Sequence, residues 1–184
     1  MTIYSALVDF LNRTDRRREP CRIPLVMNNH IGKGGHLSSQ PMGALRDYVA
    51  KDPVTEKYSV LNFPVLQDNP YRIDLEETAN LLDRFDPGLI ILGKSMILHP
   101  EPVAAIRKML DTKSTRPVIM YDMAHVLGLI GPHFQNPFAE GADIITGSTH
   151  KPFSGSQRGV LGPASEAGSA QFQLWQPLQR RAFP

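Results

Sequence analysis

The sequence is poor in cysteine, and it lacks long hydrophobic runs and a large excess of charge of either sign. Cys21 is the only cysteine among the 184 residues, so an intramolecular disulfide is excluded and a reducing compartment is expected. No apolar run approaches the ~20 residues that a membrane-spanning helix needs. Lys and Arg number 20 against 18 Asp and Glu, a balance that does not indicate nucleic acid as a partner. We therefore expect a cytoplasmic protein with neither a membrane nor a nucleic-acid partner.

Several sequence motifs that indicate targeting, catalysis or metal binding are missing as well. Residues 1–20 begin apolar and end in arginines, which is the reverse of a secretory signal peptide. The absence of a G-x-x-x-x-G-K-[ST] loop argues against a nucleoside triphosphate, and the absence of G-x-S-x-G argues against a serine hydrolase. Asp122, His125 and His150 could together ligate a metal, but this spacing is common by chance. With no H-E-x-x-H and one cysteine, we expect no metal site.

The composition is that of a globular protein, with 41% hydrophobic residues, 14 Gly and 16 Pro. Short apolar runs alternate with amphipathic segments, which predicts an α/β fold with a mostly parallel sheet. Asp74 and Glu77 form a capping box at the start of one helix, whose core face carries Leu75, Ala79, Leu82 and Phe85. The patterns predict helices over residues 5–11, 74–85, 102–110 and 166–181, and strands over residues 22–27, 57–63, 88–92, 117–121 and 142–146.

Polar residues gather just after the carboxyl ends of four predicted strands. They are Asn28, Asn29 and His30, then Lys94 and Ser95, then Asp122 and His125, and finally residues 148–151. Open α/β sheets bind ligands at this edge, where the strands end. We therefore expect these four strand ends to point polar groups into one binding crevice.

Two residues at this edge suggest cofactor chemistry. Lys151 lies in a loop of small residues beside His150 and Arg158, and neighbouring cations favour the neutral amine that a Schiff base requires. The alternative is an ordinary solvated loop lysine. Asp122 ends a predicted strand, where a fixed carboxylate could pair with the pyridinium nitrogen of pyridoxal phosphate (PLP). It could equally cap the turn that follows.

Other residues could complete such a site. His125 would enter the same crevice, or else serve as a packing histidine. His36 follows Gly34 and Gly35, which allow a flat ligand to approach, and its imidazole could stack on a ring or remain exposed in a loop. The groups that could hold a phosphate are Ser95, Ser148, His150 and loop amides.

Four stretches carry a resemblance to a known family. They are residues 34–39 (G-G-H-L-S-S), 93–95 (G-K-S), 122–129 (D-M-A-H-V-L-G-L) and 147–151 (G-S-T-H-K) with Arg158 and Gly159. In this order they resemble the serine hydroxymethyltransferase family of fold-type-I PLP enzymes. The resemblance implies a three-layer α/β fold, with residues 1–184 forming a partial PLP-dependent transferase large domain.

The resemblance also implies roles for individual residues. Lys151 would carry the cofactor, Asp122 would bind its pyridine nitrogen, and His36 would stack on its ring. His125 would lie near the ring hydroxyl and the substrate. Ser95, His150 and Arg158 would lie beside the cofactor and its phosphate. The implied reaction makes or breaks the Cα–Cβ bond of amino acids such as serine, glycine and threonine.

Two departures from the family pattern leave alternatives open. Pro152 follows the lysine where the family usually has threonine, and the following loop is longer. Both features are similar to the threonine transaldolase-like branch, which exchanges aldehydes without folate. The chain is also much shorter than the family's members, without their phosphate-cup N-terminal part and C-terminal small domain. An active homodimer, one subunit of a split enzyme with a complementing chain, an inactive fragment and a non-enzymatic binding protein all remain possible interpretations.

Overall fold

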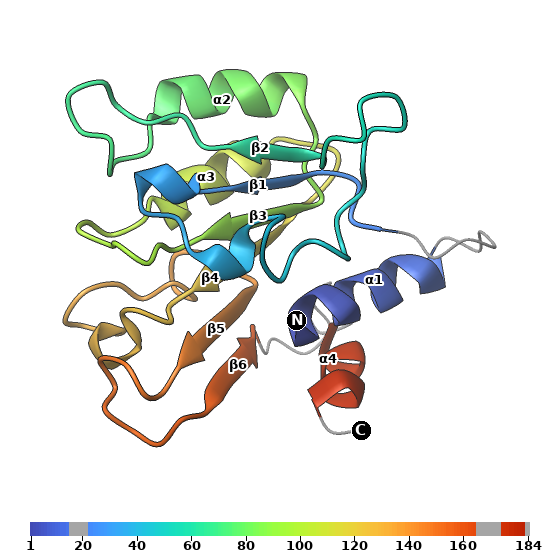
Figure 1. The fold of residues 1–184 in the computed structure, drawn as a ribbon. Helices are drawn as coiled ribbons and strands as arrows, with labels where there is room; N and C mark the ends of the chain where they lie inside the picture. Colours follow the sequence, from blue (N-terminus) through green and yellow to red (C-terminus); the bar gives the residue numbers. More distant parts are fainter. Residues whose placement is uncertain (15–21, 165–173, 183–184) are drawn as a thin grey trace.

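A single six-stranded sheet organises the molecule (Figure 1). The computed structural model describes residues 1–14, 22–164 and 174–182. The strands lie in the order β2-β1-β3-β4-β5-β6; the first five are parallel, and β6 is antiparallel to β5. Their bounds are β1 (Val26–Asn28), β2 (Val60–Asn62), β3 (Leu89–Leu92), β4 (Val118–Asp122), β5 (Ile144–Ser148) and β6 (Gly159–Pro163).

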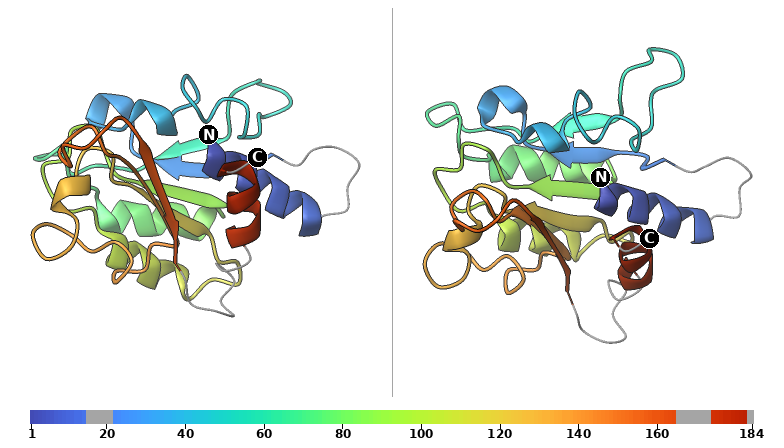
Figure 2. Two further views of the ribbon diagram at one scale, coloured as in Figure 1. Left: turned by 90° about the horizontal axis from the view of Figure 1, so that it is seen from below. Right: turned by 60° about the horizontal axis from the view of Figure 1, so that its bottom comes forward.

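Helices cover both faces of the sheet, so the fold has three layers as predicted (Figures 1 and 2). α1 (Thr2–Thr14) and α4 (Trp175–Ala182) pack on one face. α2 (Leu75–Arg84) and α3 (Val103–Leu110) pack on the other. In the described ranges, three short 3-10 helices lie in loops: η1 (Ile31–Lys33), η2 (Leu37–Ser39) and η3 (Leu127–Leu129).

The alternation of side chains along β3 explains why both faces are covered. Leu89 and Ile91 belong to the core beneath α1, whereas Ile90 and Leu92 belong to the core beneath α2 and α3. All four side chains are buried. A parallel strand that is apolar on both faces is stable only between two helical layers.

Most of the predicted elements are confirmed, with shifted ends. Asp74 caps α2, where its carboxylate accepts a hydrogen bond from the backbone N–H of Glu77 at 3.1 Å. The expectation that Phe85 faces the core is wrong, because it is the C-cap residue and 36% of its surface is exposed. β1 begins only after Pro24, which has no N–H to donate to a neighbouring strand. β5 begins two residues later than predicted.

The sequence interpretation missed β6. Gly159, Gly162 and Pro163 make this segment resemble a loop, but as the edge strand it needs hydrogen bonds on one side only. The predicted helix over residues 166–181 is observed only as α4, and its residues 166–173 lie outside the described ranges.

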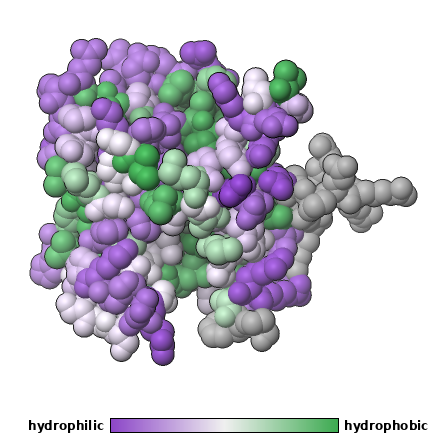
Figure 3. Space-filling view, viewed as in Figure 1, coloured by the Kyte–Doolittle hydropathy of each residue, from purple (hydrophilic) through white to green (hydrophobic). Residues whose placement is uncertain are grey.

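Part of the molecular surface is hydrophobic. Leu37, Met42, Met96 and Leu98, in the loops that follow β1 and β3, are each more than half exposed. Figure 3 shows hydrophobic side chains among hydrophilic ones near the middle of the face viewed in Figure 1. No helix within the described ranges is long and apolar enough to cross a membrane.

Candidate active site

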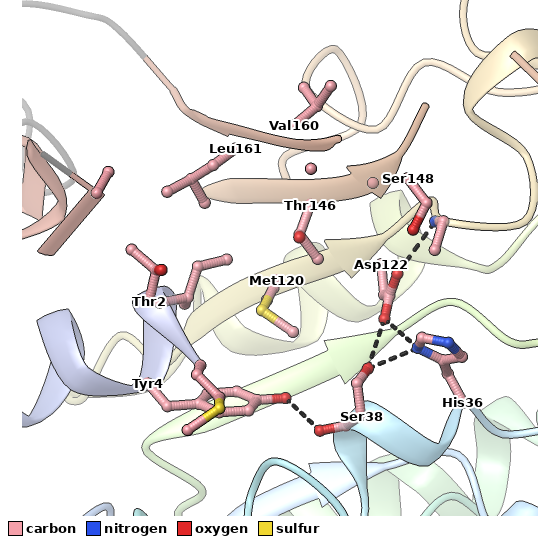
Figure 4. Close-up of a pocket in the computed structure, with 16 residues that line it drawn as sticks. Thr2, Tyr4, His36, Ser38, Met120, Asp122, Thr146, Ser148, Val160 and Leu161 are labelled. Atoms are coloured by element: carbon pink, nitrogen blue, oxygen red, sulfur yellow. Dashed lines mark hydrogen bonds and ion pairs between the residues drawn. The ribbon is translucent and has the colours of Figure 1, made fainter. Parts of the chain in front are cut away.

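Asp122 is the centre of a polar cluster at the carboxyl end of β4. Its side chain is only 4% exposed. Oδ2 accepts hydrogen bonds from Nδ1 of His36 at 2.7 Å and from Oγ of Ser38 at 2.9 Å (Figure 4). Oδ1 accepts one from the backbone N–H of Ala124 at 3.1 Å. The carboxylate therefore caps the following turn with one oxygen and faces the candidate site with the other.

The electrostatics favour an ionised Asp122. Burial raises the pKa of this carboxyl, but the hydrogen bond and the charge of His36 lower it, as do hydrogen bonds from Ala124 and Ser38. The balance leaves the pKa of Asp122 below its usual value. Because an ionised carboxylate only accepts hydrogen bonds, Nδ1 of His36 must carry the proton between them.

Lys151 and His125 extend the cluster. Nζ of Lys151 lies 3.2 Å from Nε2 of His125. The His125 ring meets that of His36 edge-on, with the ring centroids 5.2 Å apart. Burial lowers the pKa of His125, and the nearby charges of Lys151 and His36 lower it further. A neutral His125 therefore accepts a hydrogen bond from the Lys151 ammonium through Nε2 and keeps its own proton on Nδ1.

Close backbone contacts place Asp122 and His36 together across 86 residues of sequence. Gly93, at the end of β3, has a φ of +99°, and a Cβ there would lie 2.0 Å from the carbonyl oxygen of Asp122. The next residue, Lys94, pairs through its backbone with Gly35. This pairing brings the loop that carries His36 to the end of β4.

A cavity of about 410 Å³ opens beside the Asp122 end of this cluster, and its lining does not include His125 or Lys151. His36, Ser38 and Asp122 line its polar side, and Met120 and Leu161 contribute apolar surface (Figure 4). The volume falls within the range of sites that take small molecules and cofactors. Within the described ranges, no group of three or more His, Cys, Asp or Glu residues could hold a metal ion.

Known proteins are similar to most of this chain. The family model described as serine hydroxymethyltransferase matches residues 22–165. The chain belongs to the serine hydroxymethyltransferase family. The matched range includes β1 to β6 and every residue of the polar cluster.

Curated serine hydroxymethyltransferases are similar to most of the chain. The enzyme of Archaeoglobus fulgidus is 36% identical over 160 residues, covering 86% of this chain and 32% of the relative. That of Methanosphaera stadtmanae is 37% identical over 145 residues, covering 78% and 32%. That of Thermococcus gammatolerans is 38% identical over 133 residues, covering 72% and 29%. The chain thus spans about a third of the length of these relatives.

The structure brings together four of the residues predicted for a serine hydroxymethyltransferase-like site. They are His36, Asp122, His125 and Lys151.

The other three predicted residues are exposed. Ser95 donates its backbone N–H to Gly34, the Arg158 guanidinium contacts the carbonyl of Gln157, and His150 lies on the surface of the Lys151 loop. The residue beside the Lys151 amine is therefore His125, whereas the sequence suggested His150 and Arg158. The cofactor-binding roles remain predictions.

The expectation that four strand ends point into one crevice is wrong in part. Asn28, Asn29 and Lys94 are buried inside the protein, where they bond to other residues. The cavity residues that were missed include Ser38, which donates to Asp122, and Tyr4, whose hydroxyl donates to the Ser38 carbonyl at 3.1 Å. Ser38 could have been identified, since it lies two residues after His36 in the G-G-H-L-S-S stretch.

Proposed function

We propose that this chain binds PLP through Lys151 and contributes to making or breaking the Cα–Cβ bond of amino acids such as serine, glycine and threonine. The observation that carries the proposal is a buried Asp122 that is hydrogen-bonded to His36 in the same cluster as Lys151. When bound, PLP supplies an electron sink that stabilises a carbanion at Cα. A fixed anion is the partner that its protonated ring nitrogen requires.

The other cluster residues have roles that follow from their geometry. His125 lies 3.2 Å from Nζ of Lys151 through its Nε2, so it is placed to hold the Lys151 side chain by a hydrogen bond. His36 already contacts Asp122 and would cover one side of a flat ring at that carboxylate. Ser38 keeps a second hydrogen bond on Asp122 and helps it to remain ionised.

The cavity fits a group of this kind. It lies directly beside Asp122, and Gly147 and Gly159 line it without side chains that would fill it. Thr146 and Ser148 contribute hydroxyl groups to the same wall. We infer that the exposed Ser95, His150 and Arg158 assist at the cofactor's edge, as the family resemblance implies.

We further propose that residues 1–184 act as a partial large domain that associates with a second polypeptide. The support is that large hydrophobic side chains such as Met42 and Leu98 are exposed. The partner would be a second copy of this chain or a complementing chain that makes the site complete.

The first experiment is a PLP titration of the purified chain, followed by visible absorbance. Borohydride reduction and peptide mapping then locate the labelled lysine. We expect a single label on Lys151, which Lys151→Ala abolishes and the exposed-lysine control Lys57→Ala leaves unchanged. No absorbance change, or labels scattered over many lysines, would refute PLP binding by the chain alone.

Substrate assays then distinguish the two candidate reactions. A hydroxymethyltransferase interconverts serine and glycine and responds to added folate. A threonine transaldolase exchanges a supplied aldehyde for that of threonine without folate; Pro152, directly after Lys151, is the feature that favours testing it. A labelled chain that turns over none of these substrates, alone or with a complementing chain, would contradict the proposed reaction.

A further inference from the structure

A buried ion pair lies behind the candidate site, and the proposed mechanism does not use it. Lys94 and Glu101 are 2% and 3% exposed, with Nζ of Lys94 3.0 Å from Oε1 of Glu101. Nζ also donates to the backbone carbonyl of Tyr71 at 2.7 Å. We infer that Glu101 is a positioning residue that keeps His36 and Asp122 in contact. Lys94 is the partner that compensates the charge of Glu101. This inference rests on the proposed function, because it assigns Glu101 a role in cofactor binding.

The second oxygen of Glu101 holds two strand ends together. Oε2 accepts a hydrogen bond from Nδ2 of Asn29 at 2.6 Å and one from the backbone N–H of Gly93 at 3.1 Å. Asn29 directly follows β1 and Gly93 directly follows β3. One carboxylate therefore fixes the carboxyl ends of two neighbouring strands to each other.

Each of these strand ends touches the backbone beside a site residue. Gly93 lies against the carbonyl of Asp122, where a Cβ would approach to 2.0 Å. The carbonyl of Asn29 lies against Gly35, the residue before His36, where a Cβ would approach to 2.2 Å. Glu101 thus reaches both sides of the His36–Asp122 contact through the backbone, without touching either side chain.

The surrounding network has few spare hydrogen-bonding groups. The backbone N–H of Glu101 donates to Oε1 of Gln135 at 3.0 Å, and Nδ2 of Asn29 also contacts the carbonyl of Gly93 at 3.3 Å. A buried network with its polar groups satisfied is rigid and specifies one arrangement. A buried ion pair by itself is weak evidence for stability, which leaves positioning as the role to test.

The test separates the hydrogen bonds of Glu101 from its charge. Both variants carry Lys94→Met, so neither leaves a buried ammonium without a partner. The acceptor variant adds Glu101→Gln, whose amide oxygen can still accept from Asn29 and Gly93. The apolar variant adds Glu101→Met, which gives a side chain of similar length with no such oxygen. The two proteins have equal net charge and differ in this acceptor oxygen and in the amide NH2 group that accompanies it.

Two measurements report on positioning. Nitrogen NMR of the imidazoles, assigned with His36→Gln, shows in the cofactor-free chain whether His36 still bonds to Asp122. The PLP titration, with visible circular dichroism, measures affinity and ring orientation. We expect the acceptor variant to keep the His36 signal and to bind PLP within about threefold of the Lys94→Met parent, and the apolar variant to lose the signal and bind about tenfold or more weakly.

The outcomes are decisive once thermal unfolding shows that both variants are folded. If the acceptor and apolar variants behave alike in both measurements, whether intact or impaired, the positioning role is refuted. If the apolar variant does not fold, the Asn29→Ser variant takes its place. This substitution withdraws a single hydrogen bond from Glu101, and the variant is compared with the unmodified chain by the same two measurements. A wild-type chain that binds no PLP refutes the proposed function instead, and the NMR comparison still decides the role of Glu101.

Discussion

Replacing Gly93 with alanine should destabilise the protein and disturb the candidate site at the same time. Gly93 directly follows β3 and has a φ of +99°, and a Cβ at this position would lie 2.0 Å from the carbonyl oxygen of Asp122. Real Cβ atoms do not approach a backbone oxygen so closely, so β3 and β4 would have to move apart where Asp122 leaves the sheet.

The expected loss has two parts. A positive φ costs a non-glycine residue about 1–2 kcal/mol. Forcing extra volume against well-packed backbone adds about 1–3 kcal/mol. Gly131→Ala is a matched control, because Gly131 has a φ of +103° and, within the described chain, a Cβ there would meet no non-neighbouring heavy atom within 4 Å. Gly131→Ala should therefore show only the first part.

Denaturant unfolding of both variants measures these parts separately. Gly93→Ala should lower the free energy of unfolding by about 2–5 kcal/mol and Gly131→Ala by about 1–2 kcal/mol. Gly93→Ala should also weaken PLP binding in the titration described above, whereas Gly131→Ala should not. Equal losses of stability in the two variants would refute the contact between Gly93 and the Asp122 backbone as the cause.

Other perturbations test single features of the fold and site. Ile106→Ala, on the buried face of α3, should lower the free energy of unfolding in denaturant by about 2–5 kcal/mol. The pKa of Asp122 is lowered in the folded protein, so this carboxylate stabilises the fold at pH values above its usual pKa of 3.8. The contribution is lost as the pH falls through the folded pKa. Asp122→Asn should therefore flatten the dependence of stability on pH in this acidic range. The pKa of His125 is also lowered, so stability should fall as the pH drops below 6.5 towards the folded pKa, and His125→Asn should remove that slope. Lys151→Ala should leave the melting temperature nearly unchanged, because this half-buried side chain lies in a loop.

The layered fold was predictable because its strongest signals are local. The apolar run at β3 and the capping residue Asp74 each identify an element from a few neighbouring residues. β6 was missed because its strand character comes from pairing with β5, as Ile144–Pro163 and Ser148–Gly159. Pairing with a distant strand overrides the poor strand propensity of glycine and proline, and no local pattern reports it.

The candidate site was predictable to the extent that its residues follow strands. Asp122 and Lys151 were identified this way, and His36 was identified from the two glycines that precede it. The position of a residue after a strand does not say on which side of the strand end its side chain lies. Lys94 satisfies the same rule as Lys151, yet its side chain turns inwards to Glu101 whereas that of Lys151 reaches His125.

The two lysines have different surroundings because they have different roles. An ammonium buried as deeply as that of Lys94 requires a carboxylate and a carbonyl around it, and such a lysine cannot approach a substrate. Lys151 is only half-buried, and its neighbour His125 is a base with a lowered pKa rather than an anion. A neutral partner binds an ammonium less tightly than a carboxylate would. A lysine that must become a nucleophile therefore needs a half-buried place beside a neutral base, as Lys151 has. A lysine that helps to hold the backbone around His36 and Asp122 needs a buried place beside a carboxylate, as Lys94 has.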